Sequence, residues 1–270
     1  MSFNTRLSRA PHPFDPDLGR DALAHLPDLS SGLVPLIVGA AGCSPYLAGL
    51  MAREGAWLPA AMDNPEAAVA AIFAQMPEVP LQGLPDALRQ AKRRIALLTG
   101  LADLGGVWPL EVVTQVLTDF ADLAVDATIK ALVAVEVRRG KLPGMDESMV
   151  PTAAGMVVLA MGKMGAGELN YSSDIDLICL FDETRFDPAD YHDARAGFIR
   201  VTRKMAAILS DVAAGGYVFR TDLRLRPDPN STPVCISTEM AERYYESVGR
   251  TWERAAFIKA RACAGDIAAG

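Results

Sequence analysis

Apolar residues recur every three to four positions through the first half of the chain. Between residues 85 and 102 they fall on one side of a predicted helix, with charged residues on the other. The same period runs through residues 110–138, where Gly140 follows as an expected stop. A shorter helical pattern covers residues 65–76. The region 45–140 is therefore predicted to be almost entirely helical.

One stretch, residues 29–52, carries no charge and is long enough on paper to cross a membrane. Several glycines and prolines interrupt it, and a break in lipid would leave backbone groups unpaired. Ser44 followed by Pro45 is typical of an N-cap and first helical position instead. We therefore expect short helices of a globular protein here, and no association with a membrane.

The period changes after residue 155. Short, continuous apolar runs bounded by glycines are typical of buried strands. The predicted order is a strand at 156–161, a glycine-rich turn at 162–167, a strand at 174–181, a helix near 198–212, a strand at 217–226 and a helical tail ending near 262.

This succession of elements predicts the α+β class, with a mixed or antiparallel sheet. The expected organisation is a flexible N-terminus over residues 1–22, a helical region over 23–150, a mixed domain over 151–262 and a truncated end at 263–270.

Composition narrows the class of protein. Half of the 270 residues are hydrophobic, which excludes a wholly disordered chain, and the net charge of −7 argues against a general nucleic-acid binder. The four cysteines form no CxxC pair and there are only three histidines, so reduced, buried thiols are expected rather than a zinc site. Without an apolar signal segment at the N-terminus, a cytoplasmic location is expected.

Two aspartates stand out in the second predicted strand. Asp174 and Asp176 are two residues apart, so both carboxylates should project from the same side of the strand. Like charges this close repel each other unless a cation lies between them, and Mg²⁺ prefers carboxylate oxygens and substrate phosphates. The alternative is a solvated strand end, where pairs of aspartates are common.

The third predicted strand adds a possible third carboxylate. Asp222 lies between Arg220 and Arg224, and Arg226 continues the same alternation, with largely apolar residues on the other side. If this strand pairs beside the second one, Asp222 completes a three-carboxylate site and the arginines can grip phosphate. The alternative is an exposed sheet surface stabilised by Arg–Asp pairing.

The charge around this strand also suits an anionic substrate. Residues 196–261 hold 11 Lys or Arg and 7 Asp or Glu in an otherwise acidic chain. The glycines at 162–167 allow close backbone approach to phosphate, although they form neither a P-loop nor a GxGxxG motif.

Residues 162–177 (GKMGAGELNYSSDIDL) resemble the family of glutamine synthetase adenylyltransferase/adenylyl-removing enzymes. The resemblance continues through 219–227 (FRTDLRLRP), 244–246, 249–254 (GRTWER) and 258–261 (IKAR). It implies a nucleotidyltransferase fold of the DNA polymerase β type with a helical N-terminal region.

Members of this family carry two catalytic halves. The ELN at 168–170 and the Gly-Arg at 249–250 resemble the N-terminal, adenylyl-removing half, so a truncated form of that half is expected. Two departures from the family pattern are Ala166, where a glycine is usual, and the Pro-Asp-Pro at 227–229, where Pro-Phe-Gly is more frequent. The second departure puts the contacts of the following loop in doubt.

The resemblance implies phosphorolysis. Inorganic phosphate attacks the AMP on a modified tyrosine of glutamine synthetase and releases ADP, in the regulation of nitrogen assimilation. It makes Asp174, Asp176 and Asp222 the catalytic ligands of one or two Mg²⁺ ions. Candidates for binding phosphate or nucleotide are Gly162, Lys163, Gly165, Ser172, Ser173, Arg220 and Arg224. For the two serines, turn chemistry at the strand entry is an equal alternative.

Two further readings stay open. The same fold could transfer AMP from ATP to glutamine synthetase. Alternatively, the chain could be a non-catalytic regulatory fragment that docks the PII nitrogen-signal protein.

Overall fold

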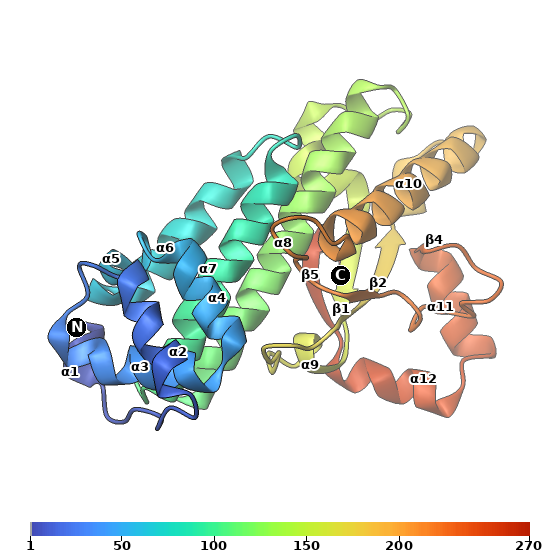
Figure 1. Cartoon of the computed structure of the whole chain (residues 1–270). Coiled ribbons are helices and arrows are strands. Elements are labelled where there is room, and N and C mark those ends of the chain that lie inside the picture. The colour runs from blue at the N-terminus through green and yellow to red at the C-terminus, as the bar shows by residue number, and fades with distance from the viewer. Residues whose placement is uncertain (1) are drawn as a thin grey trace. The chain divides into compact units, whose positions relative to one another are not determined.

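The computed structural model describes residues 2–270, which divide into two compact units. One unit holds the chain up to residue 77 together with 89–120, and the other holds 78–88 with 121–270. The two long helices α7 (Leu84–Leu104) and α8 (Leu110–Arg138) each contribute residues to both units. The boundaries after residues 88 and 120 fall within these helices, and a third boundary follows residue 77. Figure 1 shows the order of the elements along the chain.

The first unit is helical, as predicted for residues 45–140. Besides parts of α7 and α8, its α-helices are α1 (Phe3–Arg6), α2 (Pro16–Asp21), α3 (Val34–Cys43), α4 (Pro45–Glu54), α5 (Leu58–Asp63) and α6 (Pro65–Gln75). The Ser44 hydroxyl accepts a hydrogen bond from the Leu47 N–H at 3.2 Å, with Pro45 at the first position of α4. This confirms the predicted N-cap. Across residues 2–270, no helix combines the length and apolarity that a bilayer crossing requires.

The N-terminal segment contains two short helices, α1 and α2. Phe3 in α1 is fully buried, and the Asp15 carboxylate caps α2 by accepting from the backbone N–H groups of Asp17 and Leu18. Helices this short present too few apolar positions to show a period in the sequence.

A buried ion-pair cluster stabilises the first unit. Glu54 is almost fully buried and accepts from Arg93 at 2.7 Å and from Arg94 at 2.9 Å. The Arg94 guanidinium also lies 5.1 Å from the centre of the Trp57 ring. Because both carboxylate oxygens of Glu54 are paired, the cost of burying its charge is offset.

The second unit contains a five-stranded mixed sheet, which confirms the α+β class. Its order is β3 (Thr221–Asp222), β2 (Ile175–Phe181), β1 (Met156–Ala160) and β5 (Arg261–Gly265), and β4 (Cys235–Ser237) also pairs with β2. β1 is antiparallel to both β2 and β5, whereas β3 and β4 run parallel to β2. The remaining α-helices are α9 (Gly162–Gly165), α10 (Tyr191–Ser210), α11 (Thr238–Ser247) and α12 (Thr251–Ala256).

Three details of the strand prediction are wrong. The third strand covers only residues 221–222, not 217–226, because the chain turns into a proline-containing loop after Asp222. β4 was not anticipated, and β5 occupies 261–265, where the end of a helical tail was expected. The predicted buried position of the cysteines also fails at Cys43, which is exposed, although all four cysteines are free.

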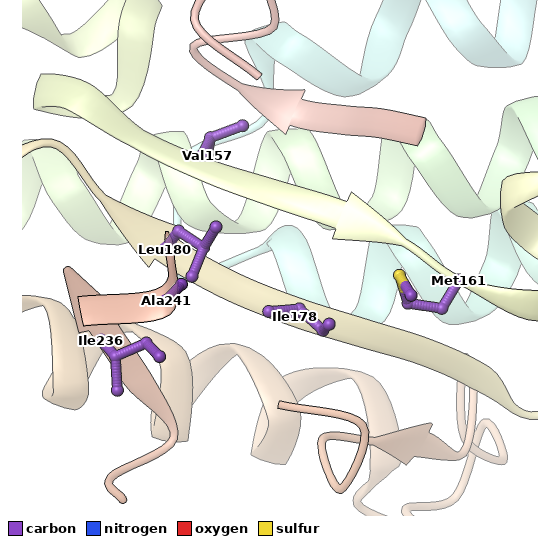
Figure 2. Close-up of a cluster of buried hydrophobic side chains, with 6 residues drawn as sticks. All are labelled: Val157, Met161, Ile178, Leu180, Ile236 and Ala241. Carbon is purple, nitrogen blue, oxygen red and sulfur yellow. The ribbon is translucent and has the colours of Figure 1, made fainter. Parts of the chain in front are cut away.

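Side chains of β2 alternate between two apolar layers. Phe181 stacks on Phe198 of α10 with ring centres 5.0 Å apart, on the side that also buries Ile175 and Leu177. On the opposite side, Ile178 and Leu180 join a cluster with Val157, Met161, Ile236 and Ala241, which Figure 2 shows. Asp176 alternates with Ile175 and Leu177, so it lies on the same side as this second cluster.

The one-turn helix α9 is packed tightly between β1 and the segment before β5. A Cβ atom on Gly165 would lie 1.8 Å from the Lys259 carbonyl oxygen and 2.5 Å from the Ala160 carbonyl oxygen. No side chain fits there without movement of the backbone.

Gly165→Ala is therefore expected to lower the free energy of unfolding by about 2–4 kcal/mol, the range of a severe core disruption. Chemical denaturation measures the change. The control is Gly49→Ala, in the interior of α4, where a Cβ would meet nothing within 4 Å. It should stabilise by up to about 1 kcal/mol through helix propensity. Equal, small effects of both substitutions would contradict the packing of α9.

Candidate functional site

The pairing of β2 with β3 brings together two of the three predicted carboxylates. In the parallel register, Ile175 is opposite Thr221 and Asp176 is opposite Asp222. The Ile175 N–H donates to the Arg220 carbonyl at 2.9 Å, and Asp174 lies directly before β2. The sequence condition for a three-carboxylate site, that these two strands are neighbours, is therefore met.

Asp174 is paired with Arg220. The Nε of Arg220 donates to Asp174 Oδ1, and its Nη2 donates to the Ser172 carbonyl at 2.7 Å. A third contact, of 3.4 Å, runs from Nη1 to the Tyr217 hydroxyl. Arg220 therefore ties the turn before β2 to the segment before β3.

Asp222 is paired with Arg224. Both carboxylate oxygens accept from this arginine: Oδ2 lies 2.5 Å from Nη2, and Oδ1 lies 2.7 Å from the backbone N of Arg224. The Arg224 side chain is 83% exposed. Arg–Asp pairing, the alternative reading of this charged strand, is thus present in the structure.

The three carboxylates differ in their electrostatic surroundings. Partial burial raises the pKa of Asp176, and the neighbouring charges of Asp222 and Asp174 raise it further. Hydrogen bonds from Arg224 hold the pKa of Asp222 below its ordinary value. Asp176 is therefore the carboxylate whose negative charge is least compensated.

The carboxylates match Mg²⁺ in chemistry but are not arranged as a finished metal centre. Within the part of the chain that the structure describes, no three His, Cys, Asp or Glu side chains are gathered closely enough to hold a metal ion. The expected convergence of Asp174, Asp176 and Asp222 on one point is not seen. Instead, guanidinium groups supply positive charge to Asp174 and Asp222. The carboxylate oxygens are hard donors of the kind that a divalent ion prefers, and they fit such an ion once the aspartate side chains rotate away from the guanidinium groups.

The glycine-rich turn reaches this site at Gly162. Its φ angle of +56° is in the left-handed region, and a Cβ there would lie 3.2 Å from Asp176 Oδ2. The N–H of Met161, directly before it, donates to the Asp176 carbonyl at 2.9 Å. Lys163 is exposed on α9. Gly165 has a packing role against Lys259, which the sequence analysis did not foresee.

The two serines of the turn differ. The Ser173 hydroxyl donates to the Asn170 side chain at 2.6 Å, which is the turn chemistry considered as an alternative. Ser172 is exposed, and its carbonyl accepts from Arg220.

Arg226 does not extend the charged row of Arg220 and Arg224. It donates to the backbone carbonyls of four residues at 2.7–3.0 Å, namely Leu223, Pro229, Thr232 and Pro233. Arg226 therefore shapes the loop between β3 and β4. The alternation of charged and apolar residues over 220–226 predicted that all three arginines lie on one exposed side of a strand, so it did not indicate this role of Arg226.

Several motif residues away from the carboxylates position the frame of the site. Arg261 of β5 makes a bidentate pair with Asp122 at 2.7 and 3.0 Å and also donates to the Met164 carbonyl of α9. Glu253 is buried and accepts from Tyr244 at 3.0 Å. The sequence pattern alone assigned no role to these residues. The signal that could have found them is a charged side chain placed among apolar residues.

Comparison with known proteins identifies the family. The profile of the glutamate-ammonia ligase adenylyltransferase family matches residues 35–270. This chain therefore belongs to that family.

Two curated relatives illustrate the match. The chain is 48% identical, over 87% of its length, to a bifunctional glutamine synthetase adenylyltransferase/adenylyl-removing enzyme of Bradyrhizobium sp. (strain BTAi1 / ATCC BAA-1182). It is 45% identical, over 84% of its length, to the enzyme of the same description from Caulobacter vibrioides. In both cases the match covers 24% of the relative. The chain thus spans about a quarter of the length of these relatives, their N-terminal quarter.

The pKa of Asp176 is raised and that of Asp222 is lowered, so substitutions of these two residues should change stability in opposite directions at neutral pH. Because the pKa of Asp176 is raised in the folded state, its ionised form disfavours folding. The free energy of unfolding therefore falls as pH rises from the ordinary pKa through the raised one. Asp176→Asn should therefore stabilise the protein at neutral pH, with the gain vanishing below about pH 4, where the wild-type carboxyl is protonated.

Asp222→Asn is the matched control of opposite sign. Because its pKa is lowered, Asp222 contributes stability above its ordinary pKa and loses that contribution as pH falls. This variant should be less stable than wild type at neutral pH and approach it in acid. Urea denaturation at several pH values measures both; destabilisation by Asp176→Asn at neutral pH would contradict the assigned electrostatics.

Proposed function

We propose that this chain carries the adenylyl-removing activity of the family, on a nucleotidyltransferase fold of the DNA polymerase β type. The observation that supports this most strongly is the parallel pairing of Asp176 with Asp222, beside Asp174 and two arginines. The ELN at 168–170 and the Gly-Arg at 249–250 favour this half of the family's two-part architecture. The names of the relatives include both adenylyl transfer and adenylyl removal.

The proposed substrates are inorganic phosphate and a tyrosine of glutamine synthetase that carries AMP. A phosphate oxygen forms a bond to the AMP phosphorus, and the bond from that phosphorus to the tyrosine oxygen breaks. The electron pair leaves with the phenolate, and the product nucleotide is ADP. Because the phenol has a pKa of about 10, this leaving group needs only modest stabilisation at neutral pH.

The chain's own residues meet the main difficulty of this reaction, which is the approach of two anions. Arg220 and Arg224 border the carboxylates and can each donate two parallel hydrogen bonds to a phosphate. Gly162 brings backbone close to Asp176, so little bulk separates this carboxylate from a bound phosphate.

Asp174, Asp176 and Asp222 would hold Mg²⁺, which when bound supplies positive charge to the attacking and leaving oxygens. The pKa of Asp176 is raised by partial burial and by the neighbouring carboxylates, whose negative charge a divalent cation would offset.

The activity is tested by incubating adenylylated glutamine synthetase with this chain, phosphate and Mg²⁺. ADP formation that depends on phosphate is expected, and Asp176→Asn should reduce it by at least about a hundredfold, since the variant loses a central ligand. AMP transfer from ATP to the unmodified synthetase, without phosphate-dependent ADP formation, would contradict the proposal and favour adenylyl transfer.

Metal binding is tested by calorimetry without substrate. Mg²⁺ or Mn²⁺ should bind weakly to the wild-type chain, and Asp174→Asn should greatly reduce the binding. Asp193→Asn removes an equal charge from an exposed position on α10 and should leave the binding unchanged. Equal binding by all three proteins would exclude Asp174 as a ligand.

A further inference from the structure

The two arginines beside the carboxylates are held in different ways. Arg220 contacts three groups, namely the Asp174 carboxylate, the Ser172 carbonyl and the Tyr217 hydroxyl. The guanidinium of Arg224 hydrogen-bonds to Asp222 alone among the contacts that the structure gives for residues 2–270, and its side chain is 83% exposed, against 52% for Arg220. Displacing Arg224 therefore costs one ion pair, whereas displacing Arg220 also breaks the link between two chain segments.

We propose that Arg224 is an exchangeable counter-ion: it stays on Asp222 until a divalent cation takes over that carboxylate, and then binds the phosphate group of the substrate. Arg220 stays in place beside Asp174. This inference rests on the proposed function for the identity of the anion, and it assigns to one arginine the binding role that the sequence leaves open between two.

The energetics favour the exchange. An ion pair with an exposed partner contributes little to stability, because water screens it and the side chain loses freedom in forming it. A divalent cation on the same carboxylate offers twice the charge without that entropic loss. The released guanidinium keeps its five N–H donors, and a phosphate is its best available acceptor nearby.

The backbone prepares Asp222 for the exchange. One carboxylate oxygen, Oδ1, accepts from the backbone N–H of Arg224 at 2.7 Å, a contact that does not depend on where the guanidinium lies. When the guanidinium leaves, Asp222 thus keeps its orientation and Oδ2 becomes available to a cation. The β2–β3 ladder fixes Asp176 directly opposite.

The exchange makes the cation and the anion depend on each other. Without metal, Arg224 is paired with Asp222 and does not contribute its positive charge to the phosphate site. When metal binds Asp222, the arginine is released and can bind phosphate. By thermodynamic reciprocity, phosphate must then also strengthen binding of the metal.

The proposal is tested without any metal, by calorimetric titration of the full 270-residue chain with inorganic phosphate in the presence of a chelator. Asp222→Asn removes the partner of Arg224, so phosphate should bind this variant about tenfold more tightly than wild type. The double variant Asp222→Asn/Arg224→Ala should lose that gain, and Asp222→Asn/Arg220→Ala should retain most of it.

Asp174→Asn is the matched control, since it removes one negative charge from the same site but leaves Arg224 on Asp222 and leaves Arg220 its contacts with Ser172 and Tyr217. Its gain in phosphate affinity should be smaller. An unchanged affinity in Asp222→Asn, a gain that survives removal of Arg224, or an equal gain in Asp174→Asn would each overturn the exchange. Repeating the titration with AMP shows whether free phosphate or the nucleotide phosphate uses the released arginine.

A second measurement uses a single substitution of an exposed side chain, which should leave the fold intact. Arg224→Ala removes the competitor for Asp222, so Mg²⁺ without phosphate should bind two- to fivefold more tightly than to wild type. Weaker binding would overturn the proposal. These outcomes are independent of ADP formation: a chain with no ADP activity but with Arg224-dependent phosphate binding would retain the exchange and lose the proposed function.

Discussion

The register between β2 and β3 sets the main constraint on this site. Once Ile175 pairs with Thr221, Asp176 must lie opposite Asp222, and Asp174 lies directly before the same strand. Partial burial raises the pKa of Asp176, and the neighbouring negative charges of Asp222 and Asp174 raise it further. Positive charge has to be present, and in this structure Arg220 and Arg224 provide it.

The rest of the second unit holds this register in place. The apolar layers on both sides of β2 prevent a shift by one residue, which would bury Asp176 and expose Ile175. Directly after the neighbouring strand β1, the Met161 N–H donates to the Asp176 carbonyl, and the glycine turn begins at the next residue. Arg261 ties that turn to α8 through Asp122. The family's motifs thus contain two kinds of residue: charged residues that form the site, and residues that hold the surrounding backbone in position.

Much of this arrangement could be predicted from the sequence, and the failures have physical causes. The helical period from residue 45 to 140 and the apolar runs at 156 and 174 were sufficient because long, regular patterns outweigh local exceptions. The third strand was overestimated because alternation of charged and apolar residues also arises where one arginine, Arg226, turns inward to bind loop carbonyls. β4 and β5 were missed because three- and five-residue strands leave almost no pattern.

The sequence indicated a strand pairing that could bring Asp176 and Asp222 together, but it did not indicate which groups pair with the carboxylates. Sequence spacing shows that Arg220 and Arg224 flank Asp222; it does not show that Arg220 reaches across to Asp174. That contact depends on a neighbouring strand 46 positions away, which local pattern cannot place.

The most direct measurement of the central claim is the anomalous diffraction of crystals of this chain soaked in Mn²⁺. A peak within about 2.2 Å of oxygens of Asp176 and Asp222, with Arg224 displaced from Asp222, is the predicted result. A map without a peak at these carboxylates, and with both arginines still paired, would contradict the account.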